Sequence, residues 1–489
     1  MLRAFFKDSI IYAIPAIISR GLSLFLVPLY TQVLSPADYG SLDLFTVFAS
    51  IVNLTIALEV SQGVARFYAE ELNADHRVAY ASSALWFTVT CHTVFALIML
   101  AFTNNLSVFI MGRPDLQDEF RVGVFYIWIS SIFYLIQNQF RWELRSRHYA
   151  LVSLIMAFVT AGMSLWLTLK LSLGLFGLLV GMVSGCGVAS ILGLWFLRKT
   201  FRVCFSFVRL RTMLAFSIPL VFSSIGVWIS LYIDRLMINQ FMSVDDVGLY
   251  GIAYRLAGIA GLVMVGFQGA LTPLIYTHHN EQGTPKHLAR IFRFFLFFAL
   301  LMFLGLTLFS KDIFNIFTSP EFYAGSDIMI YLVPAVFLSN MYIFAPGIAI
   351  EKRTNLYIWI NLAGALVNII MNWALIPVWG LEGAAVATLL AYLTVFSIHM
   401  IFSQKIYPIP HDWRTIIVSV VVAILLASLV PLLSSADWLR WIGGGMVLLL
   451  FSLFGVVVGL IKYQEMRNII LLVKSYFKST ALYLANFLR

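Results

Sequence analysis

Hydrophobic residues occur along this chain in long blocks of about 20, divided by short polar connections, as far as residue 461. A run of about 20 apolar residues is the length that an α-helix needs to cross the hydrocarbon core of a bilayer. The blocks do not alternate apolar and polar positions with the period of two that membrane strands show. The pattern therefore predicts an all-α polytopic membrane protein.

Fourteen blocks can be distinguished, and we predict about 14 transmembrane helices. Composition agrees, because 61% of the residues are hydrophobic and only 11% are charged, against about 25% charged residues in soluble domains. The blocks cover residues 9–34, 41–65, 79–103, 122–140, 149–170, 174–197, 212–240, 247–275, 290–310, 327–350, 354–377, 380–403, 414–434 and 438–461.

The connections between these blocks carry their positive charge unevenly. Arg141, Arg145 and Arg147, the segment 198–211 and the C-terminal tail fall on one side of the membrane if successive helices alternate in direction. By the positive-inside rule this side is cytoplasmic, so both termini are predicted to be cytoplasmic. The formal net charge of +9 then reflects topology and attraction to the anionic inner leaflet, and nucleic acid is not an expected partner. The N-terminus has no small-residue cleavage site and predicts a retained first helix.

The second half of the chain repeats the first at low similarity. The stretch "LSPADYG", which ends at Gly40, resembles "MSVDDVG", which ends at Gly248. Gly174 and Gly380 lie 206 positions apart, and several other matching residues share this spacing. Taken together, these matches indicate an internal duplication.

The duplication predicts two six-helix bundles at residues 1–200 and 205–405, followed by two extra transmembrane helices at 410–461. Because six helices return the chain to the same side, both units have the same orientation, as in transporters with parallel repeats. Such halves usually enclose a cavity near the middle of the bilayer. Residues 462–489 mix Lys and Arg with apolar residues at helical spacing, which predicts an amphipathic cytoplasmic tail on the inner leaflet.

Motifs for catalysis are missing from the sequence. There is no P-loop, no pair of His at zinc-binding spacing and no nucleophile elbow. The three cysteines, Cys91, Cys186 and Cys204, are scattered and predict neither a disulfide nor a metal site. The outward connections are short, whereas membrane glycosyltransferases and polymerases usually have a sizeable domain there. We expect no catalytic residue, no metal and no cofactor other than a coupling H⁺ or Na⁺, and we predict that the protein is not an enzyme.

Arg20 is the most unusual residue of the first predicted helix. It lies 12 residues after Asp8, which is about 18 Å along a helix and close to the bilayer middle. A charge at that depth costs roughly 2.5–3.5 kcal/mol on insertion scales, so it normally faces protein or water. Two interpretations remain open: a cavity-facing contact with an anionic ligand, or a structural ion pair with Glu59.

The second unit contains two further arginines of this kind, Arg235 and Arg255. Asp234 and Arg235 are adjacent and point about 100° apart on a helix, so they are predicted to be poor partners for each other. Arg255 either pairs with Asp234 across two antiparallel helices or contacts an anion directly. Both arginines are therefore candidate substrate-binding residues, and Asp234 is a candidate coupling residue or counter-ion.

Two acidic residues lie within the second predicted helix. Glu59 is predicted well inside it, and Asp43 near its outer end. Each of them either binds a coupling proton or Na⁺, or acts as a structural counter-ion, which is the interpretation we favour.

Two segments carry a family resemblance. At "FLVPLYTQVLSPADYGSLDLF" and again at "IDRLMINQFMSVDDVGLYGIAYRLAG" the chain resembles the polysaccharide transporters of the MOP superfamily. This group includes the Wzx-type O-antigen and exopolysaccharide flippases, and it is related to lipid II flippases and to multidrug and toxin extrusion (MATE) exporters. The resemblance extends from residue 1 to about residue 400, and the last two helices are less characteristic.

The resemblance implies a V-shaped pair of helical bundles in the bacterial cytoplasmic (inner) membrane, with basic residues in a central cavity. It implies that the protein moves undecaprenyl-pyrophosphate-linked oligosaccharide from the inner to the outer leaflet by alternating access. Membrane lipids, a polymerase and other polysaccharide-assembly proteins are the implied partners. The alternatives are a MATE-like exporter of organic cations, which needs acidic residues in its cavity, and a lipid II flippase.

Overall fold

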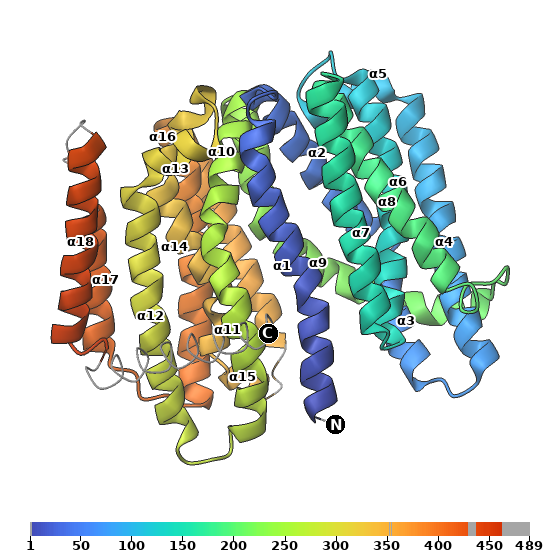
Figure 1. Ribbon diagram of the computed structural model, residues 1–489. Helices are drawn as coiled ribbons and strands as arrows, with labels where there is room; N and C mark the ends of the chain where they lie inside the picture. Colours follow the sequence, from blue (N-terminus) through green and yellow to red (C-terminus); the bar gives the residue numbers. More distant parts are fainter. Residues whose placement is uncertain (1, 352, 354, 429–436, 462–489) are drawn as a thin grey trace, which may run out of the picture.

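The computed structural model describes residues 2–351, 353, 355–428 and 437–461, and in these residues it contains helices and no strand (Figure 1). The predicted all-α class is confirmed, whereas the predicted tail at 462–489 lies outside the described residues. The helices are α1 (Leu2–Tyr30), α2 (Pro36–Thr55), α3 (Val60–Glu70), α4 (Ala74–Ala101), α5 (Thr103–Met111), α6 (Gln117–Trp142), α7 (Ser146–Leu165), η1 (Trp166–Lys170), α8 (Gly174–Phe196), α9 (Phe207–Phe241), α10 (Val244–Ala257), α11 (Ile259–His278), α12 (Thr284–Leu308), α13 (Ser310–Phe317), η2 (Pro320–Ser326), α14 (Met329–Asn340), η3 (Met341–Phe344), α15 (Gly347–Ile350), α16 (Asn355–Ile406), α17 (Trp413–Ala427) and α18 (Asp437–Val457).

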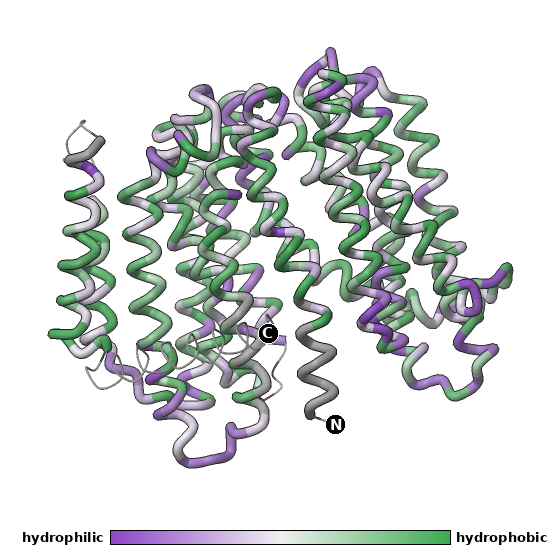
Figure 2. The backbone as a smooth tube through the Cα atoms, in the orientation of Figure 1, coloured by the Kyte–Doolittle hydropathy of each residue, from purple (hydrophilic) through white to green (hydrophobic). Residues whose placement is uncertain are grey.

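The helices form two groups, with hydrophobic positions through the middle of the molecule and hydrophilic ones gathered at its two ends (Figure 2). One group contains α4, α6, α7 and α8, the other contains α12, α14, α16, α17 and α18, and α1 and α9 run between them (Figure 1). This arrangement is the pair of bundles that the sequence predicts. It places the middle of α1, and with it Arg20, between the two groups.

The number of spans differs from the prediction of fourteen. In the described part of the chain nine helices are long and apolar enough to cross a membrane, or eleven if each of two bent pairs is one span. The first pair is α2 and α3, which meet at an angle of 43°, so the predicted helix at 41–65 is broken. Among the described residues, the apolar stretches of α1 and α17 are Ile14–Tyr30 and Trp413–Ala427, and neither is counted as a full span. The count of fourteen is therefore not confirmed.

One long element, α16, is a hairpin of two antiparallel helices. Its 52 residues would make a rod of about 78 Å at 1.5 Å per residue, far longer than a bilayer is thick. The backbone reverses at Gly380, whose φ of 56° and ψ of −131° are non-helical. Gly364 lies against Val395, and Gly383 against the carbonyl of Leu375, which only a folded-back chain allows. The hairpin corresponds to the predicted spans at 354–377 and 380–403.

The same glycine turn occurs in the first half of the chain. Gly174, 206 positions before Gly380, has a φ of +50°, a conformation that glycine adopts without the Cβ clash of other residues. Three residues later, a Cβ would clash with the carbonyl oxygen of Leu375 at Gly383 and would be tight against the main chain of Leu167 at Gly177. The shared conformation supports the internal repeat, while its boundaries at 1–200 and 205–405 stay a prediction.

Two equivalent helices, α2 and α10, cross in close contact where the two groups meet. A Cβ on Gly40 would collide with the carbonyl oxygen of Val244, and a Cβ on Gly248 with that of Pro36. The contact is reciprocal, because Pro36 and Val244 each lie four residues before the glycine of their own helix. Small residues allow helix backbones to approach this closely in a membrane. The crossing lies at the end of the molecule away from the N-terminus (Figure 1) and closes the space between the bundles there.

We predict that Gly248→Ala destabilises the protein by about 1–3 kcal/mol, since overpacking a rigid contact forces the backbone to move. Gly187→Ala on α8 is the matched control, because a Cβ at Gly187 has nothing within 4 Å. That control should melt at or above the temperature of the unmodified protein. Thermal melts of the detergent-purified proteins test this. If the two variants melt together, the crossing is not the tight contact described.

Candidate functional site

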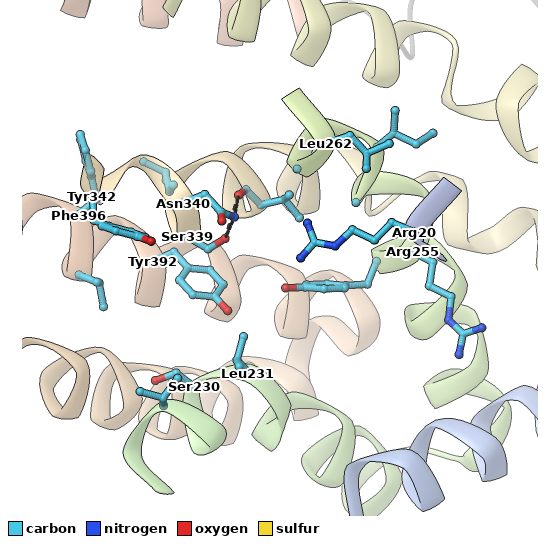
Figure 3. Close-up of a pocket in the computed structure, with 18 of the residues that line it drawn as sticks. Arg20, Ser230, Leu231, Arg255, Leu262, Ser339, Asn340, Tyr342, Tyr392 and Phe396 are labelled. Atoms are coloured by element: carbon cyan, nitrogen blue, oxygen red, sulfur yellow. Dashed lines mark hydrogen bonds between the residues drawn. The ribbon is translucent and has the colours of Figure 1, made fainter. Parts of the chain in front are cut away.

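A cavity of about 650 Å³ lies between α1 and the second bundle (Figure 3). Its wall is formed by the middle of α1, the centre of α9, the junction of α10 with α11, the end of α14 with η3, and both arms of the α16 hairpin. Its volume is in the range of small-molecule sites. The polar residues of the wall are Arg20, Ser23, Ser230, Tyr254, Arg255, Ser339, Asn340, Tyr342, Tyr357, Asn361, Tyr392 and His399.

Arg20 points into this cavity. In Figure 3 its guanidinium extends from α1 toward Ser339 and Asn340 of α14. Its side chain is exposed, and among the described residues it makes no ion pair or side-chain hydrogen bond. The alternative of a structural pair with Glu59 is therefore wrong, because Glu59 accepts a hydrogen bond from Tyr134 and lines a different cavity. Arginine stays charged at any physiological pH, so Arg20 gives the cavity an uncompensated positive charge.

Arg255 also lines the cavity, but it is paired. Its Nη2 donates to Oδ1 of Asp43 at 2.8 Å, its side chain is 36% exposed, and its guanidinium lies 5.4 Å from the ring centre of Tyr39. The predicted pairing of Arg255 with Asp234 is wrong. The reason lies in the helix crossing: Gly251, one turn before Arg255, has no side chain, and the carboxylate of Asp43 from α2 fills that space.

Asp234 pairs instead with its neighbour Arg235. The Nη1 of Arg235 is 2.9 Å from Oδ1 of Asp234, which corrects our prediction that adjacent residues are poor partners. A long arginine side chain folds back far enough to overcome the 100° between the two Cβ directions. Its Nε also lies 3.7 Å from Oδ2 of Asp43, and the Tyr250 hydroxyl donates to Asp234 at 2.7 Å. Arg235 is only 6% exposed and is not part of the cavity wall.

These four residues form one charge cluster of Asp43, Asp234, Arg235 and Arg255. Two carboxylates balance two guanidiniums, so the cluster adds no net charge. It ties α2 of the first half to α9 and α10 of the second. Arg20 is thereby the unbalanced cation of the wall, since no Asp or Glu is found among the described residues that line the cavity. The chemistry of the cavity is that of an anion site with hydroxyl and amide groups around it.

Several polar residues of the wall escaped the sequence analysis. Three tyrosines of the wall lie in apolar helices, where a tyrosine normally belongs to the core: Tyr254, Tyr357 and Tyr392. His399 lies between apolar neighbours near the end of α16. A polar side chain inside a predicted span was the available signal, but only the fold shows which of them face one space. Within the described part of the chain, His, Cys, Asp and Glu nowhere gather in groups of three as ligands for a metal ion.

We predict that Asp43→Asn destabilises the protein by about 3 kcal/mol, because it leaves a partly buried guanidinium without its carboxylate. The double variant Asp43→Asn/Arg255→Gln should regain part of that loss, since the orphaned cation is removed with its partner. Asp118→Asn is the control, because Asp118 pairs with Arg121 on the exposed surface and is worth at most about 1 kcal/mol. Chemical or thermal unfolding checks this, and simple additivity of the two changes would contradict the coupling.

Solved structures of membrane transporters share this fold. A lipid II flippase, MurJ, in an inward closed conformation superimposes with a TM-score of 0.70 at 18% sequence identity, covering 91% of this chain and 99% of that one. A multidrug resistance MATE family transporter of the MOP superfamily, in an inward-facing conformation, gives a TM-score of 0.65 at 16% identity, covering 81% of this chain and 97% of that one. These similarities show a common fold of two helical bundles.

Sequence comparison supplies the family. A relative from Haloferax volcanii, named as a probable low-salt glycan biosynthesis flippase, is 28% identical over 213 residues, or 40% of this chain. The match spans 43% of the length of that relative. The profile of the MatE family matches residues 219–374, and that of the polysaccharide biosynthesis protein family matches residues 5–279, more than half of the chain. The chain therefore belongs to the family of polysaccharide biosynthesis proteins.

Proposed function

We propose that this protein is a flippase that moves undecaprenyl-pyrophosphate-linked oligosaccharide from the inner to the outer leaflet of the bacterial cytoplasmic membrane by alternating access. The observation that carries the proposal is the unpaired guanidinium of Arg20, in a cavity whose described wall contains no carboxylate. The family of the chain and the name of its glycan flippase relative support the choice of substrate class.

The electrostatics of the cavity suit a pyrophosphate. Such a group carries at least two negative charges, and moving it unpaired into hydrocarbon is prohibitively costly. The guanidinium of Arg20 presents planar donors that match two phosphate oxygens at once. Arg255 lies in the same wall and keeps part of its side chain exposed while it holds Asp43. One free and one shared cation would attract the head group without the tight binding that prevents release.

The rest of the wall suits a sugar. Tyr342, Tyr357 and Tyr392 present flat apolar rings with a hydroxyl at the tip, and Asn340 and Asn361 add amide donors and acceptors. This mixture can pack against the apolar face of a sugar ring and hydrogen-bond its hydroxyl groups. The polyprenyl tail needs no protein cavity, because it can remain in the lipid beside the bundles.

The position of the α2–α10 crossing at one end of the cavity is compatible with alternating access. The α2–α10 crossing closes the end away from the N-terminus, while the cavity wall reaches Tyr357 in the first turn of α16, beside α15 at the other end (Figure 1). With the N-terminus in the cytoplasm, as the charge distribution predicts, the closed end is the outer one. Separation of α2 from α10 would then open the cavity outward, and the bundles would approach at the opposite end.

A MATE-like exporter of organic cations is the less suitable alternative. A cationic substrate needs a carboxylate in the cavity, and the two acids of the charge cluster, Asp43 and Asp234, are held by arginines. A lipid II flippase carries a head group with the same pyrophosphate chemistry. It is separated from our proposal by a genetic test, because loss of lipid II transport is lethal whereas loss of a surface polysaccharide need not be.

We predict that Arg20→Ala lowers surface polysaccharide by about 10- to 100-fold, the factor expected for a lost charge-assisted contact of roughly 1.5–3 kcal/mol. Arg20→Lys should retain part of the export, because it keeps the charge but not the planar fork. The measurement is polysaccharide on cells that lack the chromosomal gene and carry each variant, with protein levels determined in the membrane fraction.

Arg66→Ala is the matched control, because Arg66 pairs with Glu70 on the surface of α3, away from the cavity. It should export normally. Unchanged polysaccharide in both Arg20→Ala and Arg255→Ala would overturn the anion site.

A further inference from the structure

Another cavity, of about 450 Å³, lies in the first bundle, where α6 and α8 end and α7 begins. Three cations and one carboxylate line this basic pocket, namely Arg145, Arg198, Lys199 and Glu143. Their connections are among those that the charge distribution predicts to be cytoplasmic. Among the described residues, the basic pocket shares no part of its wall with the large cavity. It is therefore a separate space with an excess of positive charge.

The carboxylate of the basic pocket, Glu143, is already used within the protein. Its Oε1 accepts hydrogen bonds from the hydroxyl of Thr200 at 2.6 Å and from that of Tyr68 at 3.2 Å. Its Oε2 accepts from Nη1 of Arg145 at 3.3 Å, and its side chain is only 13% exposed. Glu143 therefore balances Arg145 and leaves the charges of the other two cations without a carboxylate.

Arg145 is held in a fixed position by the turn that ends α6. Leu144 has a φ of +55°, and the amide of Arg145 donates to the carbonyl of Phe140 at 2.8 Å, which is the pattern of a C-terminal helix cap. The guanidinium of Arg145 lies 5.4 Å from the ring centre of Phe140, and its Nη1 also donates to the carbonyl of Phe196 in α8 at 3.2 Å. This cation is thus positioned by both α6 and α8.

Arg198 and Lys199 follow the last turn of α8 and are exposed. Within the described chain neither of them makes an ion pair or a side-chain hydrogen bond, and the guanidinium of Arg198 lies 5.3 Å from the ring centre of Trp195. Two adjacent cations of this kind, one of them a planar guanidinium, are suited to the oxygens of a phosphate group.

An exposed apolar face of α8 leads to these two cations. Val188, Ile191 and Trp195 are 40%, 70% and 57% exposed, and their spacing places them on one side of the helix. Such a face on a membrane-spanning helix contacts lipid chains, and a tryptophan in the last turn is typical of the membrane interface. Arg198 lies seven residues after Ile191, which is about 10 Å further along the helix axis. A lipid chain against this face therefore has its phosphate at the level of Arg198, whereas a soluble anion has no use for the apolar face.

We propose that the basic pocket binds one anionic phospholipid of the inner leaflet. Arg198 and Lys199 hold the phosphate of its head group beside Arg145, and an acyl chain lies along Val188 and Ile191 of α8. Basic pockets between transmembrane helices on the cytoplasmic side are suited to acidic head groups. A general attraction of basic connections to the leaflet acts on many lipids at once, whereas this site retains a single molecule.

The position of the site gives the lipid a structural effect. The segment after α8 leads to α9 and so joins the two halves of the chain. It is held to α4 by Ser82, whose hydroxyl accepts from the amide of Arg202 at 2.9 Å, and by Ser83, whose hydroxyl accepts from the amide of Ser206 at 2.8 Å. A lipid bound at Arg198 and Lys199 would fix the beginning of this segment as well. The stability of the protein should therefore depend on anionic lipid.

The test is binding of phosphatidylglycerol to the delipidated full-length protein in detergent. Native mass spectrometry should show one retained phosphatidylglycerol at concentrations where phosphatidylcholine is not retained. Phosphatidylglycerol should also raise the melting temperature, whereas phosphatidylcholine and inorganic phosphate at equal concentration should not. The double variant Arg198→Gln/Lys199→Gln should bind phosphatidylglycerol about tenfold more weakly or worse, because it removes both unbalanced cations. Each single variant should show part of this loss, and all three should melt like the unmodified protein in phosphatidylcholine.

Arg147→Gln/Arg211→Gln is the matched control, because it removes two exposed cations from the connections of the same side, outside the wall of the basic pocket. It should bind phosphatidylglycerol normally. Equal weakening in this control would indicate only a general attraction to the leaflet, and an equal effect of inorganic phosphate would indicate a site for a soluble anion. Either result, or retention of phosphatidylcholine as strong as that of phosphatidylglycerol, would overturn the proposal. Binding is measured without an oligosaccharide substrate, so the outcome does not depend on the proposed function.

Discussion

The close crossing of α2 and α10 is the contact on which the rest of the structure depends. Two glycines, Gly40 and Gly248, bring the backbones together where the halves of the chain meet, and Gly251 leaves space one turn further on. That space admits the carboxylate of Asp43, which then reaches Arg255 and Arg235 of the other half. Without side-chain-free positions on α10, the acid would be displaced and two membrane-embedded cations would lose a partner.

The crossing therefore also determines the charge of the large cavity. Because Asp43 and Asp234 neutralise the arginines of the second half, the excess positive charge is left to Arg20 on α1. A substrate phosphate would meet one free cation and one that is shared with Asp43. When α2 and α10 separate, Arg255 would lose Asp43 and become available in its turn. In the proposed transport cycle, opening of the outer end and the strength of the anion site would thus be linked by the same carboxylate.

Much of this fold follows from the sequence, because bilayer thickness and hydrophobic run length determine where helices form. The sequence alone predicts the helical class, the central position of Arg20 and the equivalence of Gly174 and Gly380. The ion pairs could be found only in the structure, because Asp43 and Arg255 are 212 positions apart and meet only at the helix crossing. The break at Glu59 was also invisible, because its apolar flanks continue the helical pattern and the left-handed turn is imposed by packing. Sequence reasoning finds unusual residues, whereas their partners depend on tertiary contacts.

The two halves thus differ in how they treat an intramembrane charge. In the second half, Arg235 is buried among acids and tyrosines, and in the described structure its charge is internally balanced. In the first half, Glu59 lies at the break between α2 and α3 and accepts a hydrogen bond from Tyr134, and no basic side chain is found among the described residues of that wall. The charges of the second half are thus fixed by ion pairs, whereas Arg20 and Glu59 of the first half are held by none, and α9 contacts α3 at Gly63 and lines the large cavity at Ser230.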